Sequence, residues 1–186
     1  MKIKTEHSRE YKIEEAVILN HKKLGYELIY PPIRRVLFYR GSGFVDLVLL
    51  PKENKHRLVL VEAKHSTNAE SGDKVIGQLL KYYAYALTLG TNSLTLLTNF
   101  AENHAETAYQ IDKITPQKLC GGLHRDKAMP QMIAGRRLQS KEIGLFVAVN
   151  GKVEPSLSLI VSTLREQHKL SIGIIQVSDD GSIDIQ

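Results

Sequence analysis

The sequence is poor in several features that would point to particular classes of protein. It contains a single cysteine, Cys120, in 186 residues. One cysteine excludes an internal disulfide and a cysteine-rich zinc or iron–sulfur site. No apolar run approaches the roughly 20 residues that a membrane helix requires, and no apolar segment of the kind found in secretory signals follows residues 1–7. We therefore expect a cytoplasmic protein that does not enter a membrane.

The composition that remains is typical of a folded domain. Apolar residues make up 42% of the chain and charged residues 24%, which argues against disorder. The length suits one domain with a substantial core, or one domain with an elaboration. The 25 Lys and Arg residues exceed the 20 Asp and Glu residues, giving a formal charge of +5. This excess allows a polyanionic partner without identifying one.

Apolar spacing and turn residues predict helices that alternate with strands. The expected elements are a helix over 8–24, strands over 26–30, 36–39, 44–50 and 58–64, a helix over 74–89, a strand over 93–98, a strand over 143–149, a helix over 156–169, and a hairpin of 171–177 with 183–185. Ser8 is the expected N-cap of the first helix and Gly25 its C-cap. The polar stretch 99–140 is expected to be irregular with short helices. This order of elements indicates an α/β or α+β fold.

Charged side chains interrupt two of the apolar strands. Asp46 lies within 44–50, and Glu62 and Lys64 end the next strand. Because side chains alternate along a strand, Glu62 and Lys64 share one face. If the two strands form a hairpin centred on Asn54, Asp46 lies opposite Glu62, with Cβ atoms about 4.5–5.5 Å apart. A register shifted by one residue would place the two acids on opposite faces.

Two carboxylates at this separation favour a particular chemistry. They repel each other unless one is protonated or a cation lies between them, and a hard divalent ion such as Mg²⁺ is the natural bridge. Lys64 beside that ion could neutralise developing charge or position a water, while the metal polarises a phosphate and helps to ionise water. The pattern therefore predicts a phosphodiester-hydrolysing site. The alternative is a structural ion pair of Lys64 with Glu62 or Asp46.

The two helices that flank these strands supply further candidates. Gln78, Lys81 and Tyr82 fall on one stripe of the second helix, where they could orient a water or bind a phosphate. The alternative for this stripe is the solvated edge of an amphipathic helix. On the first helix Glu14 borders the apolar stripe, which makes it the candidate for a third acid near the site. The alternative for Glu14 is a favourable interaction with the helix dipole.

Basic residues near these strands are candidates for contacts with a nucleic-acid backbone. Arg34, Arg35 and Arg40 flank the strand that carries Asp46 and are the first choice. Such contacts add affinity that falls with salt and carry no sequence preference by themselves. The alternative is a solvated basic face with no ligand.

Taken together, these residues resemble the PD-(D/E)XK nuclease superfamily. The resemblance rests on Glu14 in the first helix, Asp46 in a strand, Glu62-Ala63-Lys64 in the next strand, and the run from Gln78 to Tyr82 in the following helix. It implies a restriction-endonuclease-like α-β-β-β-α-β core with a mixed sheet, which would occupy residues 1–98. We then expect an irregular insertion over 99–140 and a C-terminal β-α-β-β extension over 141–186, packed on the same domain.

The resemblance also implies a role for each residue of the site. Asp46 and Glu62, joined by the carbonyl of Ala63, would hold Mg²⁺ or Mn²⁺. Lys64 would assist the attacking water, Gln78 would support the site, and Glu14 would add a further acid. The implied activity is divalent-metal-dependent hydrolysis of phosphodiester bonds, most simply as a DNA endonuclease.

Partners are expected on the same basis. Arg34, Arg35, Arg40, Lys81 and Tyr82 would bind the nucleic acid, and a homodimer is expected by analogy with nucleases that cut two strands. The alternative function is a non-catalytic nucleic-acid-binding or protein-interaction module on the same nuclease-like fold.

Overall fold

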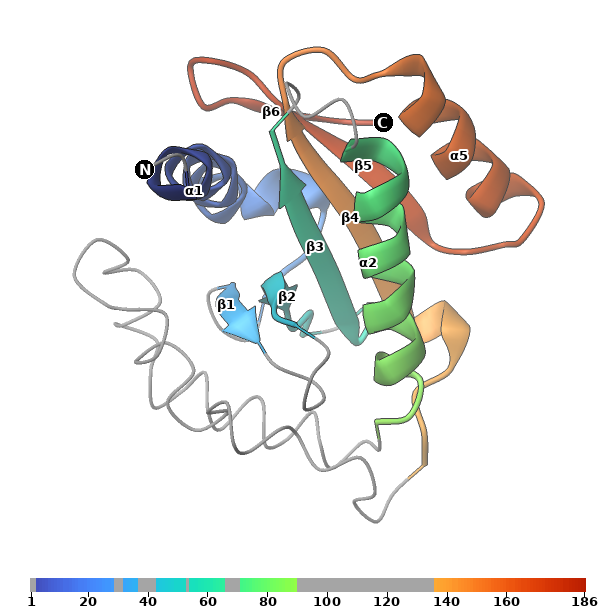
Figure 1. Ribbon diagram of the computed structural model, residues 1–186. Helices are drawn as coiled ribbons and strands as arrows, with labels where there is room; N and C mark the ends of the chain where they lie inside the picture. Colours follow the sequence, from blue (N-terminus) through green and yellow to red (C-terminus); the bar gives the residue numbers. More distant parts are fainter. Residues whose placement is uncertain (1–2, 29–31, 37–42, 53, 66–70, 90–135) are drawn as a thin grey trace.

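A six-stranded mixed sheet forms the centre of the computed structural model (Figure 1). The structure describes residues 3–28, 32–36, 43–52, 54–65, 71–89 and 136–186. The strands lie in chain order across the sheet: β1 (Ile33–Val36), β2 (Val45–Leu49), β3 (Leu58–Lys64), β4 (Ile143–Asn150), β5 (Ile172–Val177) and β6 (Ile183–Ile185). The central strands β3, β4 and β5 are parallel, and the remaining neighbours are antiparallel. The expected mixed α/β class is confirmed at this level.

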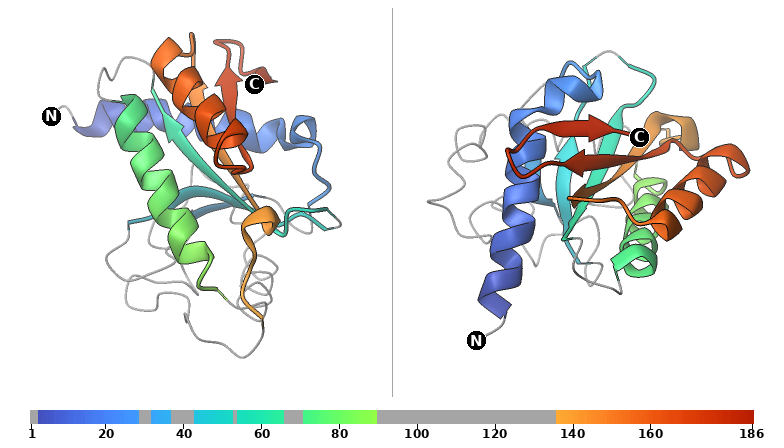
Figure 2. Two further views of the ribbon diagram at one scale, coloured as in Figure 1. Left: turned by 90° about the vertical axis from the view of Figure 1, so that its right-hand side faces the viewer. Right: turned by 90° about the horizontal axis from the view of Figure 1, so that it is seen from above.

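Helices cover both faces of the sheet (Figure 2). Helix α1 (Ile3–Leu19) crosses one face, and helices α2 (Ser71–Ala86) and α5 (Pro155–Glu166) pack on the other. Because side chains alternate along each strand, the core has two parts, one on each face of the sheet. Leu47 and Leu49 of β2 pack beneath α1, whereas Val48 packs with α2. Fully burying one such side chain contributes about 1.5–3 kcal/mol. The two faces therefore hold α1 and α2 against the strands that carry the charged residues.

The pairing of β2 with β3 has the register that the hairpin argument predicted. Leu47 pairs with Val61, and Leu49 pairs with Val59. Continuing this ladder by one residue places Asp46 opposite Glu62, as the turn centred on Asn54 requires. The prediction of this register is confirmed.

Several element boundaries differ from the expectation. Helix α1 begins at Ile3, so Ser8 lies inside the helix and is not its N-cap. The helix ends at Leu19, and a short 3₁₀ helix, η1 (His21–Leu24), follows it and ends at Gly25, whose φ of 75° confirms the predicted left-handed cap. Of the strand expected over 26–30, the described residues 26–28 form a single bridge, between Leu28 and Pro51, and residues 29–30 lie outside the described residues. Helix α2 begins at Ser71, earlier than the expected residue 74. The negative charge of Asp73 in its first turn interacts favourably with the helix dipole.

The C-terminal segment belongs to the same sheet as the N-terminal strands. Strand β4, which follows the 3₁₀ helix η3 (Ser140–Glu142), pairs along its length with β3, from Leu58 opposite Ile143 to Lys64 opposite Val149. The predicted hairpin after residue 171 is confirmed as β5 and β6. The strand expected over 93–98, and most of the insertion expected over 99–140, lie outside the described residues. Within the described ranges, no helix combines the length and apolar character needed to cross a bilayer.

Candidate functional site

The charged residues of β2 and β3 meet at the carboxyl end of β3. Asp46 and Glu62 are 6% and 2% exposed, so both carboxyl groups lie inside the protein. The backbone N–H of Ala63 donates a hydrogen bond of 2.9 Å to Oδ2 of Asp46. The Nζ atom of Lys64 lies 4.0 Å from Oε1 of Glu62. The structure thus brings together the two acids and the amine that the sequence predicted.

Glu62 is the least satisfied polar group of this cluster. Its Oε2 atom is buried and has no hydrogen-bond partner among the described residues. Burial, followed by the charge of Asp46, raises the pKa of Glu62 to about 9, although Lys64 acts in the opposite direction. A buried carboxyl oxygen without a partner costs free energy. The cost would be offset by a proton or a cation at this position.

Lys64 is held as an ammonium ion by acids on three elements, α1, β2 and β3. Burial alone would lower the pKa of Lys64, but the charge and hydrogen bond of Glu10, with the charges of Glu62 and Asp46, raise it above the ordinary lysine value. The shortest of these contacts joins Nζ of Lys64 to Oε1 of Glu10 on α1 at 3.0 Å. Lys64 is therefore suited to stabilise negative charge or to orient a water, and less suited to remove a proton.

Glu10 is a site residue that the sequence argument passed over in favour of Glu14. The side chain of Glu14 is buried and forms an ion pair with Arg34 of β1. The guanidinium of Arg34 also lies 4.3 Å from the centre of the Tyr11 ring. Glu14 remains near enough to Glu62 to raise its pKa, but the contact with Lys64 is made by Glu10, one turn earlier on the same flank of the helix.

Helix α2 contributes a buried tyrosine and an exposed lysine. Tyr82 is 2% exposed, and its hydroxyl donates a hydrogen bond of 3.0 Å to the carbonyl of Phe44, beside the start of β2. Lys81 is exposed, and its ammonium lies 5.3 Å from the centre of the Tyr82 ring. Gln78 is half-buried one turn earlier. Tyr82 therefore packs in the core and is not placed to stack on a nucleic-acid base, whereas the role of Gln78 stays a prediction.

The arginines proposed to contact nucleic acid differ in position. The Arg34 side chain is 4% exposed, and its charge is neutralised by Glu14, so the structure does not support a contact between Arg34 and a phosphate. Arg35 belongs to β1, but its side chain lies outside the described residues, and so does the whole of Arg40.

The donor set at β3 fits a hard divalent cation bound by few protein ligands. Asp46 and Glu62 supply carboxylates, and Glu62 offers the oxygen that has no described partner. The N–H of Ala63 points toward Asp46, and the carbonyl of a strand residue points toward the same neighbour as its N–H. In the part of the chain that the structure describes, no group of three or more His, Cys, Asp or Glu side chains is placed to hold a metal ion. Mg²⁺ commonly takes one or two carboxylates and completes its shell with water and substrate phosphate.

Comparisons with known proteins do not assign the chain to a family. No family model, no curated protein and no solved structure matches it significantly. The functional argument therefore depends on the residues and the geometry of the site.

Proposed function

We propose that this protein is a divalent-metal-dependent nuclease that hydrolyses phosphodiester bonds, with DNA as the expected substrate. One observation carries the proposal. Glu62 is buried opposite Asp46, has an oxygen with no partner in the described structure, and has a pKa raised to about 9. The two buried acids have too little positive charge around them, even with the ammonium ion of Lys64 nearby. A bound cation would supply the missing charge.

The residues of the site would divide the chemistry between them. Asp46, Glu62 and the carbonyl of Ala63 would hold Mg²⁺ or Mn²⁺, which when bound supplies the Lewis acidity that polarises a phosphate. Lys64, protonated and held by Glu10, would stabilise the charge that develops on the phosphate oxygens and orient the attacking water. The burial of Asp46 and Glu62 strengthens these electrostatic interactions because little water screens them.

The order of elements supports a PD-(D/E)XK-like core. In the described part of the chain, α1, β1, β2, β3, α2 and β4 follow in the order α-β-β-β-α-β, and residues 90–135, between α2 and β4, lie outside it. In this assignment β4, which is parallel to β3, is the last strand of the core, and the strand expected over 93–98 lies outside the described residues. Strands β5 and β6 and helix α5 then extend the core at one edge of its sheet.

The proposal is tested by metal-dependent cleavage of plasmid DNA and of single-stranded and duplex oligonucleotides. We expect cleavage with Mg²⁺ or Mn²⁺ and none with EDTA. Asp46→Asn and Lys64→Met should each lower the rate by about 10²-fold or more. Asp184→Asn is the matched control, because Asp184 is an exposed aspartate on β6 of the same sheet. Undiminished metal-dependent cleavage by an Asp46→Asn/Lys64→Met double variant would refute the assignment.

A second candidate function is a non-catalytic nucleic-acid-binding or protein-interaction module on the same fold. The raised pKa of Glu62 favours it, because a protonated Glu62 beside Asp46 needs no cation at neutral pH. The two functions are separated by titrating the protein with Mn²⁺ while DNA binding is followed by fluorescence anisotropy. DNA binding without any bound Mn²⁺ would favour the non-catalytic module.

A further inference from the structure

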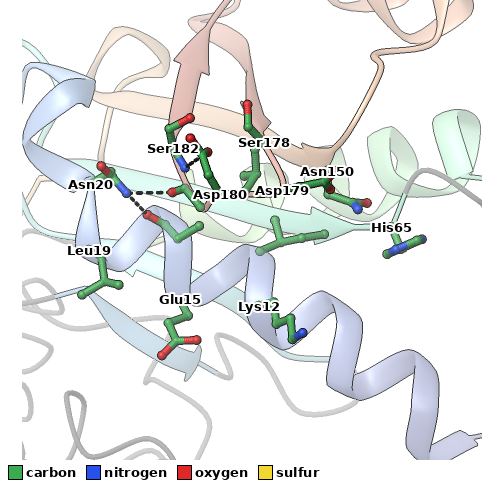
Figure 3. A pocket seen from close by; sticks show the side chains of 14 residues that line it. Lys12, Glu15, Leu19, Asn20, His65, Asn150, Ser178, Asp179, Asp180 and Ser182 are labelled. Atoms are coloured by element: carbon green, nitrogen blue, oxygen red, sulfur yellow. Dashed lines mark hydrogen bonds between the residues drawn. The ribbon is translucent and has the colours of Figure 1, made fainter.

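A hollow of about 710 Å³ lies beside the proposed site, on the face of the sheet that α1 covers (Figure 3). Its walls come from α1, from the carboxyl ends of β3, β4 and β5, and from the turn that joins β5 to β6. This volume falls within the range of about 300–1,000 Å³ that is usual for pockets that bind small molecules.

The topology of the sheet places a row of polar residues in this hollow. His65 follows β3, Asn150 ends β4, and Ser178 follows β5. The ladders pair Lys64 with Val149 and Asn150 with Val177, so these strand ends lie side by side.

The far wall of the hollow is fixed by hydrogen bonds within the structure. The Nδ2 atom of Asn20 donates to the carbonyls of Ala16 and Gly181, at 3.0 Å each. Within the turn, the N–H of Ser178 donates to the carbonyl of Ser182, and the N–H of Ser182 donates to Oδ1 of Asp180. The turn is thereby attached to the end of α1, and the hollow needs little rearrangement to accept a ligand.

The hollow is lined by three acids, Glu15, Asp179 and Asp180, as well as by Lys12 and His65. Figure 3 shows Lys12 and His65 toward one end, and Asn20 with the turn residue Asp180 toward the other. Lys12 at the first end suits an anionic group, whereas the Asp180 carboxylate at the second end can accept hydrogen bonds from the amino group of a base. Two strand spacings separate His65 from Ser178, about 10 Å, which is comparable with the length of one nucleotide.

The cationic end of the hollow is also the end nearest the proposed site. His65 directly follows Lys64 at the end of β3, whereas Lys12 and Glu10, two residues apart in α1, point to opposite sides of the helix. Successive strand residues point to opposite faces, so the hollow and Lys64 lie on the two sides of the end of β3. A chain of nucleotides bound across this end of the sheet could reach both.

We propose that the hollow is a nucleotide subsite. It takes one nucleotide of the substrate, with the phosphate beside Lys12 and His65 and the base against Asn150 and the β5–β6 turn. This assignment rests on the proposed nuclease function for the identity of its ligand. A base can enter only when it is unpaired, so the subsite selects nucleic acid with an unpaired nucleotide beside the cleavage point.

The test measures binding without metal, using the full chain and the four 5′-deoxynucleoside monophosphates as probes. Titrations followed by amide chemical shifts or calorimetry should show a nucleotide bound more tightly than its nucleoside. Lys12→Gln and Asn150→Leu should each weaken binding of the nucleotide by about tenfold. Lys22→Gln is the matched control, because Lys22 is an exposed lysine just beyond α1 that does not line the hollow. Thermal melting checks that each variant is folded.

Three results would overturn the subsite: no binding of any of the four nucleotides, binding that survives both substitutions, or nucleosides bound as tightly as nucleotides. These outcomes are independent of catalysis. If metal-dependent cleavage is present but no nucleotide binds, the subsite is wrong and the nuclease stands. If a nucleotide binds in the hollow but no DNA is cleaved, the subsite is supported and the nuclease assignment is wrong.

Discussion

Glu62 and Glu142 are both buried glutamates beside the central parallel strands, and they differ in almost every other respect. Glu142, at the end of η3, accepts hydrogen bonds from both terminal nitrogens of Arg136 and from the N–H of Gln139. These interactions lower the pKa of Glu142 to about 2, with the hydrogen bond of Arg136 as the largest cause. Glu62 has a pKa raised to about 9 by burial and by Asp46.

The difference shows what each carboxylate contributes. Glu142 joins η3 to the residues before it, forms a capping box with Gln139, and is stabilised as an anion. Glu62 is placed where its anion is unstable without a further positive charge. A side chain that only held the fold together would be expected to resemble Glu142. The site at β3 is therefore a place where stability is given up, as is common at functional sites.

The largest expected effect is on the rate of DNA cleavage, which should fall when Glu62 is replaced but not when Glu142 is replaced. Glu62→Gln should lower metal-dependent cleavage of DNA by about 10²–10³-fold, because it removes a proposed ligand of the cation. Glu142→Gln should leave the rate within about twofold at 25 °C, since Glu142 contacts none of the proposed site. Initial rates at saturating Mg²⁺ measure both. Equal losses in the two variants would remove the distinction between the two glutamates.

The next effect concerns binding of metal in the absence of DNA. Mn²⁺ at about 100 times its dissociation constant should stabilise the folded protein by about 2.7 kcal/mol, and Asp46→Asn should abolish that gain. Thermal melting at pH 8 with and without Mn²⁺ gives the measurement. The Glu142→Gln variant should show the same rise in melting temperature with Mn²⁺ as the wild type. If Mn²⁺ does not raise the melting temperature of the wild type, the proposed site is contradicted.

A smaller effect concerns stability, where substitution of Glu142 should cost more than substitution of Glu62. Without metal, Glu142→Gln should lower the free energy of unfolding by about 1–2 kcal/mol, because it weakens charge-assisted hydrogen bonds to a half-exposed arginine. Glu62→Gln should leave the free energy of unfolding unchanged or increase it, since a neutral amide replaces an unfavourable buried acid. Urea unfolding at pH 7 compares the two variants.

The pH dependence of stability provides a check on Glu142. Its pKa is lower in the folded protein than its ordinary value of 4.5, so the unfolded chain binds the proton more tightly. The stabilisation is therefore present above pH 4.5 and is lost as the pH falls toward 2. Wild type should lose more stability than Glu142→Gln over this interval. Parallel loss in the two proteins would show that the pair with Arg136 contributes nothing measurable.

The smallest expected effect is that of Glu10. Glu10→Gln should lower the cleavage rate by about tenfold, because it removes the charge that holds Lys64 protonated and in place. The loss should grow at alkaline pH, where Lys64 in the variant begins to lose its proton. Glu166→Gln, which changes an exposed glutamate at the end of α5, should cleave at the wild-type rate. A pH–rate profile of Glu10→Gln parallel to that of the wild type would exclude this role.

The local parts of the site could be predicted from the sequence, and the parts that depend on distant elements could not. The register of β2 and β3 follows from the short connection between them, so the apposition of Asp46 and Glu62 was predictable. The choice between Glu10 and Glu14 was not, because both lie on one flank of α1. It was decided by Arg34 on β1, which pairs with Glu14. The burial of Tyr82 likewise depends on its contact with Phe44.

The order of strands in the sheet was also only partly predictable from the sequence. The long apolar runs of β3 and β4 predict buried central strands, and their bounds differ little from the expected 58–64 and 143–149. Their adjacency could not be read from the sequence, because 78 residues separate the end of β3 from the start of β4. The strand expected over 93–98 is nearer to β3 in sequence, and it lies outside the described residues.

The bond from Asn20 to Gly181 joins parts of the chain that are 161 residues apart, and α1 packs across β3, β4 and β5 together. During synthesis on the ribosome, the surface that receives the first helix is therefore incomplete until the last hairpin has emerged. Glu10 reaches Lys64 only after that helix has docked, so a nascent chain that is still short of its final hairpin would have the acids of the site without the partner that orders its lysine.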